Sequence, residues 1–188
     1  MQELKILYLN KGNYSYYLYK NKYLLIINME KQYLRDIWVL YFHDNSSNWD
    51  NSSFKQVTII NSVEDFCKIY KLLNNENYWL KGMFFIFRED IMPRWEDENN
   101  INGGCFSYKI STSEADDKWF DLCGKVLGES LSSKECYNSN INGISITPKK
   151  NANIIRIWLK DNELVNPECY NISVTKFSTL LYKKHTND

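Results

Sequence analysis

Two tryptophans in polar surroundings are the residues of this chain whose type and position point most directly to chemistry. Trp95 stands in the run 93–98, PRWEDE, and Trp49 stands in the run 46–51, SSNWDN. The first run continues into Asn-Asn-Ile-Asn-Gly-Gly, which predicts a loop. A tryptophan in a polar loop has little hydrophobic core to enter. The two rings can pack on a sheet edge, or they can serve as stacking platforms for a planar ligand.

A planar, positively charged base is the ligand that two tryptophans and a carboxylate would suit. A 7-methylguanine held between two indole rings gains cation–π attraction on both faces, on the order of 2 kcal/mol when desolvated. That corresponds to roughly 30-fold preference over neutral guanine. The base presents two donors, N1–H and the 2-amino group, on one edge, and the Glu96 carboxylate next to Trp95 can accept both. A paired contact of this kind contributes about 1–3 kcal/mol of discrimination.

Strands near the end of the chain can supply the floor of such a site. Alternation along 154–160, IIRIWLK, places Arg156 and Trp158 on the face opposite the apolar residues. The run 143–149 separates its isoleucines from a polar face in the same way. If the two polar faces adjoin, basic residues become available to a polyphosphate: Lys149, Lys150 and Arg156. The alternative is that these are solvated surface charges.

Most of the chain is predicted to form the strands that would hold these residues. Runs rich in Tyr, Leu, Ile and Phe recur between polar turns. We predict strands over 5–10, 14–19, 23–28, 37–43, 54–60, 82–88, 104–110, 143–148, 154–160 and 180–183. Two helices interrupt them, one from Ser62 and one from Ser113, each with an aspartate three residues later. Trp119 in the second helix and Trp38 in an apolar run are predicted to be core.

Sequential strands with two inserted helices predict an α+β fold, with one antiparallel β-sheet and helices on one of its faces. No repeat or linker divides the 188 residues. We therefore expect a single domain over 1–188, in which 1–30 form a strand-rich N-terminal extension. The sequence does not determine the structure of the segment 165–177, which contains Pro167.

Composition bounds the partners and the location. The 23 basic and 23 acidic residues balance, so long-range attraction to a nucleic-acid backbone is weak, and a nucleic acid would be gripped locally. The 5 cysteines are scattered without Cys-x-x-Cys spacing, which favours free thiols over a disulfide framework or zinc site. The first apolar runs are too short to span a bilayer and do not form a secretory signal. We expect a cytoplasmic protein that is not bound to a membrane.

Taken in order, these motifs resemble the translation initiation factor 4E family, the mRNA cap-binding proteins of eukaryotic translation. The similar segments are the family's opening strand (38–42, WVLYF), first helix (62–66, SVEDF), cap loop (91–98, IMPRWEDE, then Gly103-Gly104), second helix (119–130) and cap-floor strand (155–158, IRIW).

The resemblance implies a curved antiparallel sheet with helices on its convex face and the ligand slot on its concave face. It implies that Trp49 and Trp95 are the stacking pair, that Glu96 reads the base edge, and that Trp158 contacts the N7-methyl group. The residues it implies for the phosphates are Lys149, Lys150 and Arg156. Its implied partners are capped mRNA and an initiation factor 4G-like scaffold, with no cofactor and no metal.

Several positions depart from the family pattern. Cys105 stands where the family has an arginine after the two glycines, so one phosphate contact is expected to be missing. On the surface that binds the scaffold's Tyr-x-x-x-x-Leu-Φ motif, Cys67 replaces a tryptophan, Gly124 a leucine and Gln32-Tyr33 a His-Pro pair. Loss of the tryptophan removes the largest anchor of such a site. We hypothesise that the N-terminal strands cover this surface or bind a non-standard partner.

Three functions follow from these patterns. The first is a non-catalytic, cap-binding initiation factor, and the second is a repressor or decoy that occupies the cap without recruiting ribosomes. The third is an enzyme acting on caps or nucleotides, with metal ligands Glu96, Asp97 and Glu98. The chain has only 2 histidines and no Gly-rich phosphate loop, so catalysis is not expected.

Overall fold

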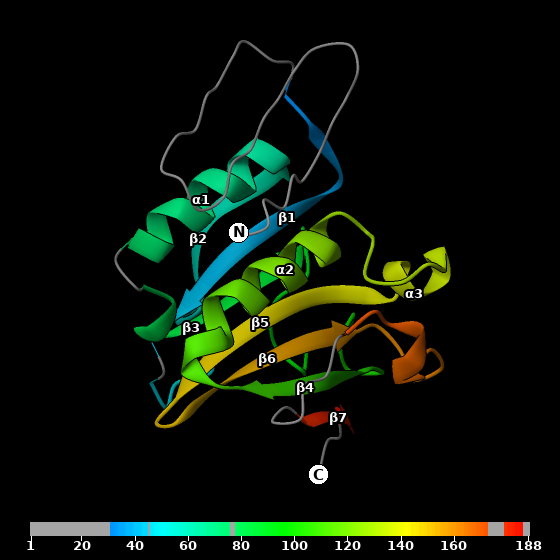
Figure 1. The fold of residues 1–188 in the computed structure, drawn as a ribbon. Helices are drawn as coiled ribbons and strands as arrows, with labels where there is room; N and C mark the ends of the chain where they lie inside the picture. The colour runs from blue at the N-terminus through cyan, green and yellow to red at the C-terminus, as the bar shows by residue number, and fades with distance from the viewer. Residues whose placement is uncertain (1–30, 45, 76–77, 173–178, 186–188) are drawn as a thin grey trace. The chain divides into compact units, whose positions relative to one another are not determined.

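A seven-stranded antiparallel β-sheet organises the residues that the computed structural model describes, which are 31–44, 46–75, 78–172 and 179–185. The strand order is β2-β1-β3-β5-β6-β4-β7 (Figure 1). The bounds are β1 (Tyr33–His43), β2 (Lys55–Ser62), β3 (Met83–Arg88), β4 (Gly104–Ile110), β5 (Ile141–Lys149), β6 (Ala152–Leu159) and β7 (Thr179–Lys184). Every neighbouring pair is antiparallel, as predicted. The strands predicted over 5–10, 14–19 and 23–28 lie outside the described residues.

Two long helices and one short helix accompany the sheet: α1 (Val63–Asn75), α2 (Ala115–Leu127) and α3 (Glu135–Ser139). The start of α1 is as predicted, because the Ser62 hydroxyl accepts a hydrogen bond from the Asp65 amide at 3.2 Å. The predicted start of α2 at Ser113 was wrong. A 3₁₀ turn, Thr112–Glu114, precedes the helix, and Ser111 closes it by donating to the Glu114 carboxylate at 2.6 Å.

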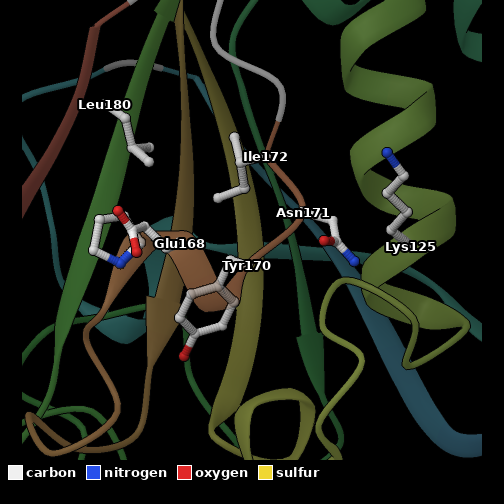
Figure 2. Close-up of a pocket in the computed structure, with 7 residues that line it drawn as sticks. Lys125, Glu168, Tyr170, Asn171, Ile172 and Leu180 are labelled. Carbon is white, nitrogen blue, oxygen red and sulfur yellow. The ribbon is translucent and has the colours of Figure 1, made fainter.

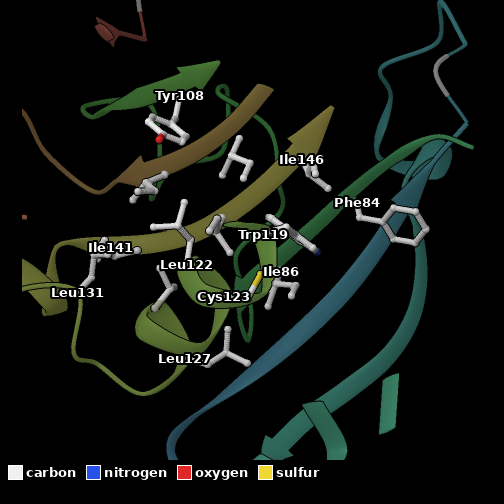
Figure 3. Close-up of a cluster of buried hydrophobic side chains, with 14 of the residues drawn as sticks. Phe84, Ile86, Tyr108, Trp119, Leu122, Cys123, Leu127, Leu131, Ile141 and Ile146 are labelled. Carbon is white, nitrogen blue, oxygen red and sulfur yellow. The ribbon is translucent and has the colours of Figure 1, made fainter. Parts of the chain in front are cut away.

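Both long helices pack on the same face of the sheet, so the predicted α+β arrangement is confirmed (Figure 1). Trp38 and Trp119 are fully buried there, as expected. Figure 3 shows Trp119, Leu122 and Cys123 of α2 turned toward the isoleucines of the sheet. Trp79 is also buried and meets the Trp119 ring edge-on at 5.6 Å.

The helix side is completed by a segment for which the sequence predicted no element. A 3₁₀ turn, Pro167–Cys169, begins where the Asn166 side chain accepts from the Glu168 amide. Tyr170 follows, is buried, and donates its hydroxyl to the Leu164 carbonyl at 2.7 Å. All five cysteines are free, as predicted. No helix of the described part is long and apolar enough to cross a membrane.

Candidate functional site

The helix-free face of the sheet carries rows of side chains that cross five strands. Directly paired residues of adjacent strands point to the same face, so the register defines these rows. One row, from β3 to β7, consists of Phe87, Gly143, Trp158, Cys105 and Lys183. The next consists of Phe85, Ser145, Arg156, Ser107 and Leu181. The polar faces of the runs 143–149 and 154–160 therefore adjoin, as the sequence analysis required.

Trp158 is held rigidly in the middle of this face. Its indole Nε1 donates to the Ser145 hydroxyl at 3.0 Å, and its ring meets the Phe87 ring edge-on at 5.3 Å. Gly143 makes this packing possible, because a Cβ at that position would lie 2.5 Å from the Phe87 ring. Trp158 is only 8% exposed, so it can offer a ligand an edge rather than a whole ring face.

Trp49 lies in the loop between β1 and β2 and is 46% exposed. Its ring stacks on the buried His43 ring, with centroids 4.3 Å apart and an interplanar angle of 14°. The same histidine contacts the Asn48 carbonyl through Nε2 at 2.8 Å. One face of the Trp49 ring is therefore occupied by the protein itself. This stacking could not be predicted from residue types, because it depends on the position of His43 at the end of β1.

Trp95 lies in the loop between β3 and β4 and is 39% exposed. Asp97 shapes this loop, because one of its carboxylate oxygens accepts from the Met92 amide at 3.1 Å and the other from the Asn99 amide at 2.9 Å. Both oxygens of this acidic side chain are therefore used in holding the loop. Among the described residues, no group of three or more His, Cys, Asp or Glu side chains is arranged to hold a metal ion.

Two buried asparagines, absent from our predicted site, tie the loop to the sheet. The side-chain nitrogen of Asn100 (Nδ2) donates to the backbone carbonyls of Met92 at 2.9 Å and Arg94 at 2.7 Å. Asn142, at the start of β5, donates to the Asn99 carbonyl at 2.6 Å and to the Asn100 side-chain oxygen at 3.0 Å. The loop that carries Trp95 is thus held to the start of β5 by several hydrogen bonds.

Arg94 joins the two tryptophan-bearing loops. Its Nη1 donates to the Asn51 side-chain oxygen at 2.6 Å, and Asn51 follows Trp49 by two residues. Its Nη2 lies 3.3 Å from a carboxylate oxygen of Glu96, which is 38% exposed. One arginine therefore links the loop of Trp49, the loop of Trp95 and the predicted base-reading carboxylate.

A separate hydrophobic cluster lies under both loops on the helix-free face. Its members are Val39, Tyr41, Phe54, Met83, Phe85, Phe87, Ile91 and Trp158. Ile91 comes from the loop of Trp95, and the Phe54 ring lies 6.1 Å from that of Trp49. Both tryptophan-bearing loops thus contribute a residue to the cluster that contains Trp158.

The three predicted phosphate-binding residues are placed differently from one another. Arg156 is two residues from Trp158 on the same strand and face, and its Nη1 donates to the Thr147 hydroxyl at 3.2 Å. Lys149 and Lys150 are exposed at the turn between β5 and β6. Lys149 stands six residues along β5 from the position paired with Trp158, which is roughly 20 Å at the usual strand rise.

His185, just after β7, is a site residue that the sequence analysis missed. Its Nδ1 contacts the Asn100 carbonyl at 2.9 Å, and its ring lies 5.0 Å from that of Trp158. Its Nε2 is buried and has no hydrogen-bond partner among the described residues. Burial lowers the pKa of His185, while the bond to Asn100 and the charge of Glu96 oppose that shift. Only the placement of β7 beside β4 brings this histidine to the site.

A hollow among the described residues lies away from this site. It has a volume of about 540 Å³ on the helix side, and Figure 2 shows Lys125 of α2 facing the segment of Tyr170 across it.

Comparison with known proteins supports the architecture. The Ascaris suum eIF4E-3, solved in complex with m2,2,7G cap, is similar with a TM-score of 0.71 and 21% identity, over 85% of this chain and 94% of that one. The C. elegans eIF4E-3, solved with the 4E-binding protein Mextli and cap analog, gives a TM-score of 0.69 at 22% identity, over 83% and 94%. These likenesses establish the fold: a curved antiparallel sheet backed by helices.

Curated relatives show the family. The chain is 31% identical over 137 residues to the eukaryotic translation initiation factor 4E of Candida glabrata, covering 69% of this chain and 64% of that protein. It is 33% identical over 138 residues to that of Eremothecium gossypii, covering 69% and 63%. It thus spans slightly under two thirds of these relatives. The family model of eukaryotic initiation factor 4E matches residues 33–187. The chain belongs to the eukaryotic initiation factor 4E family.

Proposed function

We propose that this protein binds the 7-methylguanosine cap at the 5′ end of mRNA and acts, without catalysis, as a cytoplasmic translation initiation factor. The observation that carries the proposal is the link from Arg94 to Asn51 at 2.6 Å. It holds the loops of Trp49 and Trp95 together beside the cluster that contains Trp158. Capped complexes of related folds add support.

The geometry favours a sandwich with one ring face from each loop tryptophan. The inner face of Trp49 is covered by His43 at 4.3 Å, so its outer face receives the base. Trp95 covers the other side of the base, and Glu96 accepts from the N1–H and 2-amino group. Arg94, 3.3 Å from the Glu96 carboxylate, holds it in position. Trp158 presents its edge to the N7-methyl group.

Substitution of Trp95 tests the sandwich. Trp95→Ala is expected to weaken binding of 7-methyl-GTP at least tenfold, because it removes one of two cation–π contacts that together contribute about 2 kcal/mol and also removes stacking area. Trp95→Phe retains a ring and should lose less. Isothermal titration calorimetry measures both without relying on tryptophan emission. Unchanged affinity in Trp95→Ala would rule out this site.

A second function, a repressor or decoy, is favoured by the surface between α1 and α2. Phe120 fills this region, stacking on Phe66 at 5.4 Å and lying 4.3 Å from Tyr70. Cys67 of α1 is partly buried, and Gly124 of α2 is exposed with open space around it. A scaffold helix would find no tryptophan anchor here.

A labelled peptide carrying the Tyr-x-x-x-x-Leu-Φ motif separates the two functions. Binding at low micromolar concentration, measured by fluorescence anisotropy, would favour the initiation factor. Absence of binding by a protein that still binds 7-methyl-GTP would favour the decoy, and the double variant Cys67→Trp, Gly124→Leu should then gain affinity for the peptide.

A further inference from the structure

Two cations flank Cys105 on the helix-free face. Lys183 of β7 pairs directly with Cys105, and Arg156 of β6 stands one row away from it. At the usual spacing of about 4.8 Å between strands, Lys183 is two strands, or roughly 10 Å, from Trp158. Lys149 is roughly 20 Å from the same row. Lys183 is therefore nearer to the floor of the slot than the lysines of the β5–β6 turn.

The charge of Lys183 is available to a ligand. Its side chain is exposed, and no described residue forms an ion pair with it. Burial raises the pKa of the Cys105 thiol, and the charges of Arg156 and Lys183 oppose that rise, so both cations lie close to the sulfur. The Ser107 hydroxyl, 3.9 Å from this sulfur, adds a hydrogen-bonding group between them. The strip from Arg156 to Lys183 is thus positive and carries the Ser107 hydroxyl.

We propose that Lys183 binds the phosphate chain of the capped 5′ end, which crosses β4 from Arg156 toward β7. This inference rests on the proposed cap binding. An ammonium group on a flexible stem can reach phosphate oxygens as a point charge, while the guanidinium of Arg156 offers a directed pair of donors. The family pattern has an arginine at the position of Cys105 in β4. Lys183 of β7 supplies a positive charge next to this position.

The test compares two neighbouring lysines. Lys183→Ala is expected to weaken 7-methyl-GTP binding about fivefold to tenfold while changing binding of the nucleoside 7-methylguanosine less than twofold. Lys184→Ala removes the same charge from the next residue, on the opposite face of the strand, and should change neither. Added salt should weaken 7-methyl-GTP binding less in Lys183→Ala than in Lys184→Ala, because the first variant has already lost a charge contact. Lys183→Arg should retain most of the affinity.

Equal effects of the two alanine variants, or an equal loss for nucleoside and nucleotide, would overturn the proposal. So would an unchanged Lys183→Ala beside a double variant, Lys149→Ala and Lys150→Ala, that loses affinity. These results differ from a failure of the proposed function itself, in which the unaltered protein would not prefer 7-methyl-GTP to GTP.

Discussion

His185 links the C-terminal strand to both the loop of Trp95 and the floor of the slot. The ring contacts the Asn100 carbonyl at 2.9 Å and lies 5.0 Å from Trp158. Burial lowers its pKa below the ordinary value of 6.5, so the ring is neutral at pH 7. A neutral ring suits a slot for a cationic base, because a second positive charge nearby would repel that base.

Acidification should therefore weaken cap binding through His185. As the pH falls through the lowered pKa, the ring gains a proton beside the base, and affinity for 7-methyl-GTP should fall several-fold between pH 7.5 and 5.5. His185→Gln should show less of this fall, and the ligand's own titration is common to both proteins. Identical pH profiles would contradict this role.

The lowered pKa of His185 also determines how the free energy of unfolding depends on pH. The unfolded chain takes up the proton at the ordinary pKa, before the folded chain does. The free energy of unfolding is therefore expected to fall as pH drops from about 6.5 to the lower folded pKa, and to be independent of this group below that.

At the scale of elements, local patterns predicted most of the sheet. The strand predicted over 104–110 has those bounds, and the face assignments of β5 and β6 are confirmed. The predicted strand over 37–43 begins earlier, at Tyr33, because its first residues pair with the end of β2 rather than following an apolar pattern. The helix α3 was missed because it has only five residues and no hydrophobic stripe.

Two glycines in different elements give opposite predictions for stability. Gly124 lies within α2, and a Cβ there would meet nothing within 4 Å, so Gly124→Ala should raise the free energy of unfolding by about 0.5–1 kcal/mol. Gly143→Ala would press on the Phe87 ring at 2.5 Å and should lower it by about 1–3 kcal/mol. Urea unfolding followed by circular dichroism measures both.

Gly143→Ala should also affect ligand binding, because the Phe87 ring that it displaces packs against Trp158 at 5.3 Å. Gly143→Ala is expected to weaken 7-methyl-GTP binding, whereas Gly124→Ala should leave it unchanged. The reverse order, in stability or in binding, would contradict the packing described for these elements.

At the scale of the whole molecule, the candidate site is assembled from segments distant in sequence. The strand order β3-β5-β6-β4-β7 brings the last described strand next to β4, so Lys183 and His185 reach the same face as Trp158. Residue types, their spacing and the family resemblance predicted Trp49, Trp95, Glu96 and Trp158 as site members. They could not reveal the contribution of β7, because strand order and register arise from long-range pairing.

The most direct test of the central claim is quenching of intrinsic tryptophan fluorescence by 7-methyl-GTP beside GTP. A cation–π preference of about 2 kcal/mol predicts that the methylated nucleotide binds at least tenfold tighter, with quenching from the stacked rings of Trp49 and Trp95. Equal affinity for both nucleotides, or no quenching by either, would contradict cap recognition by this fold.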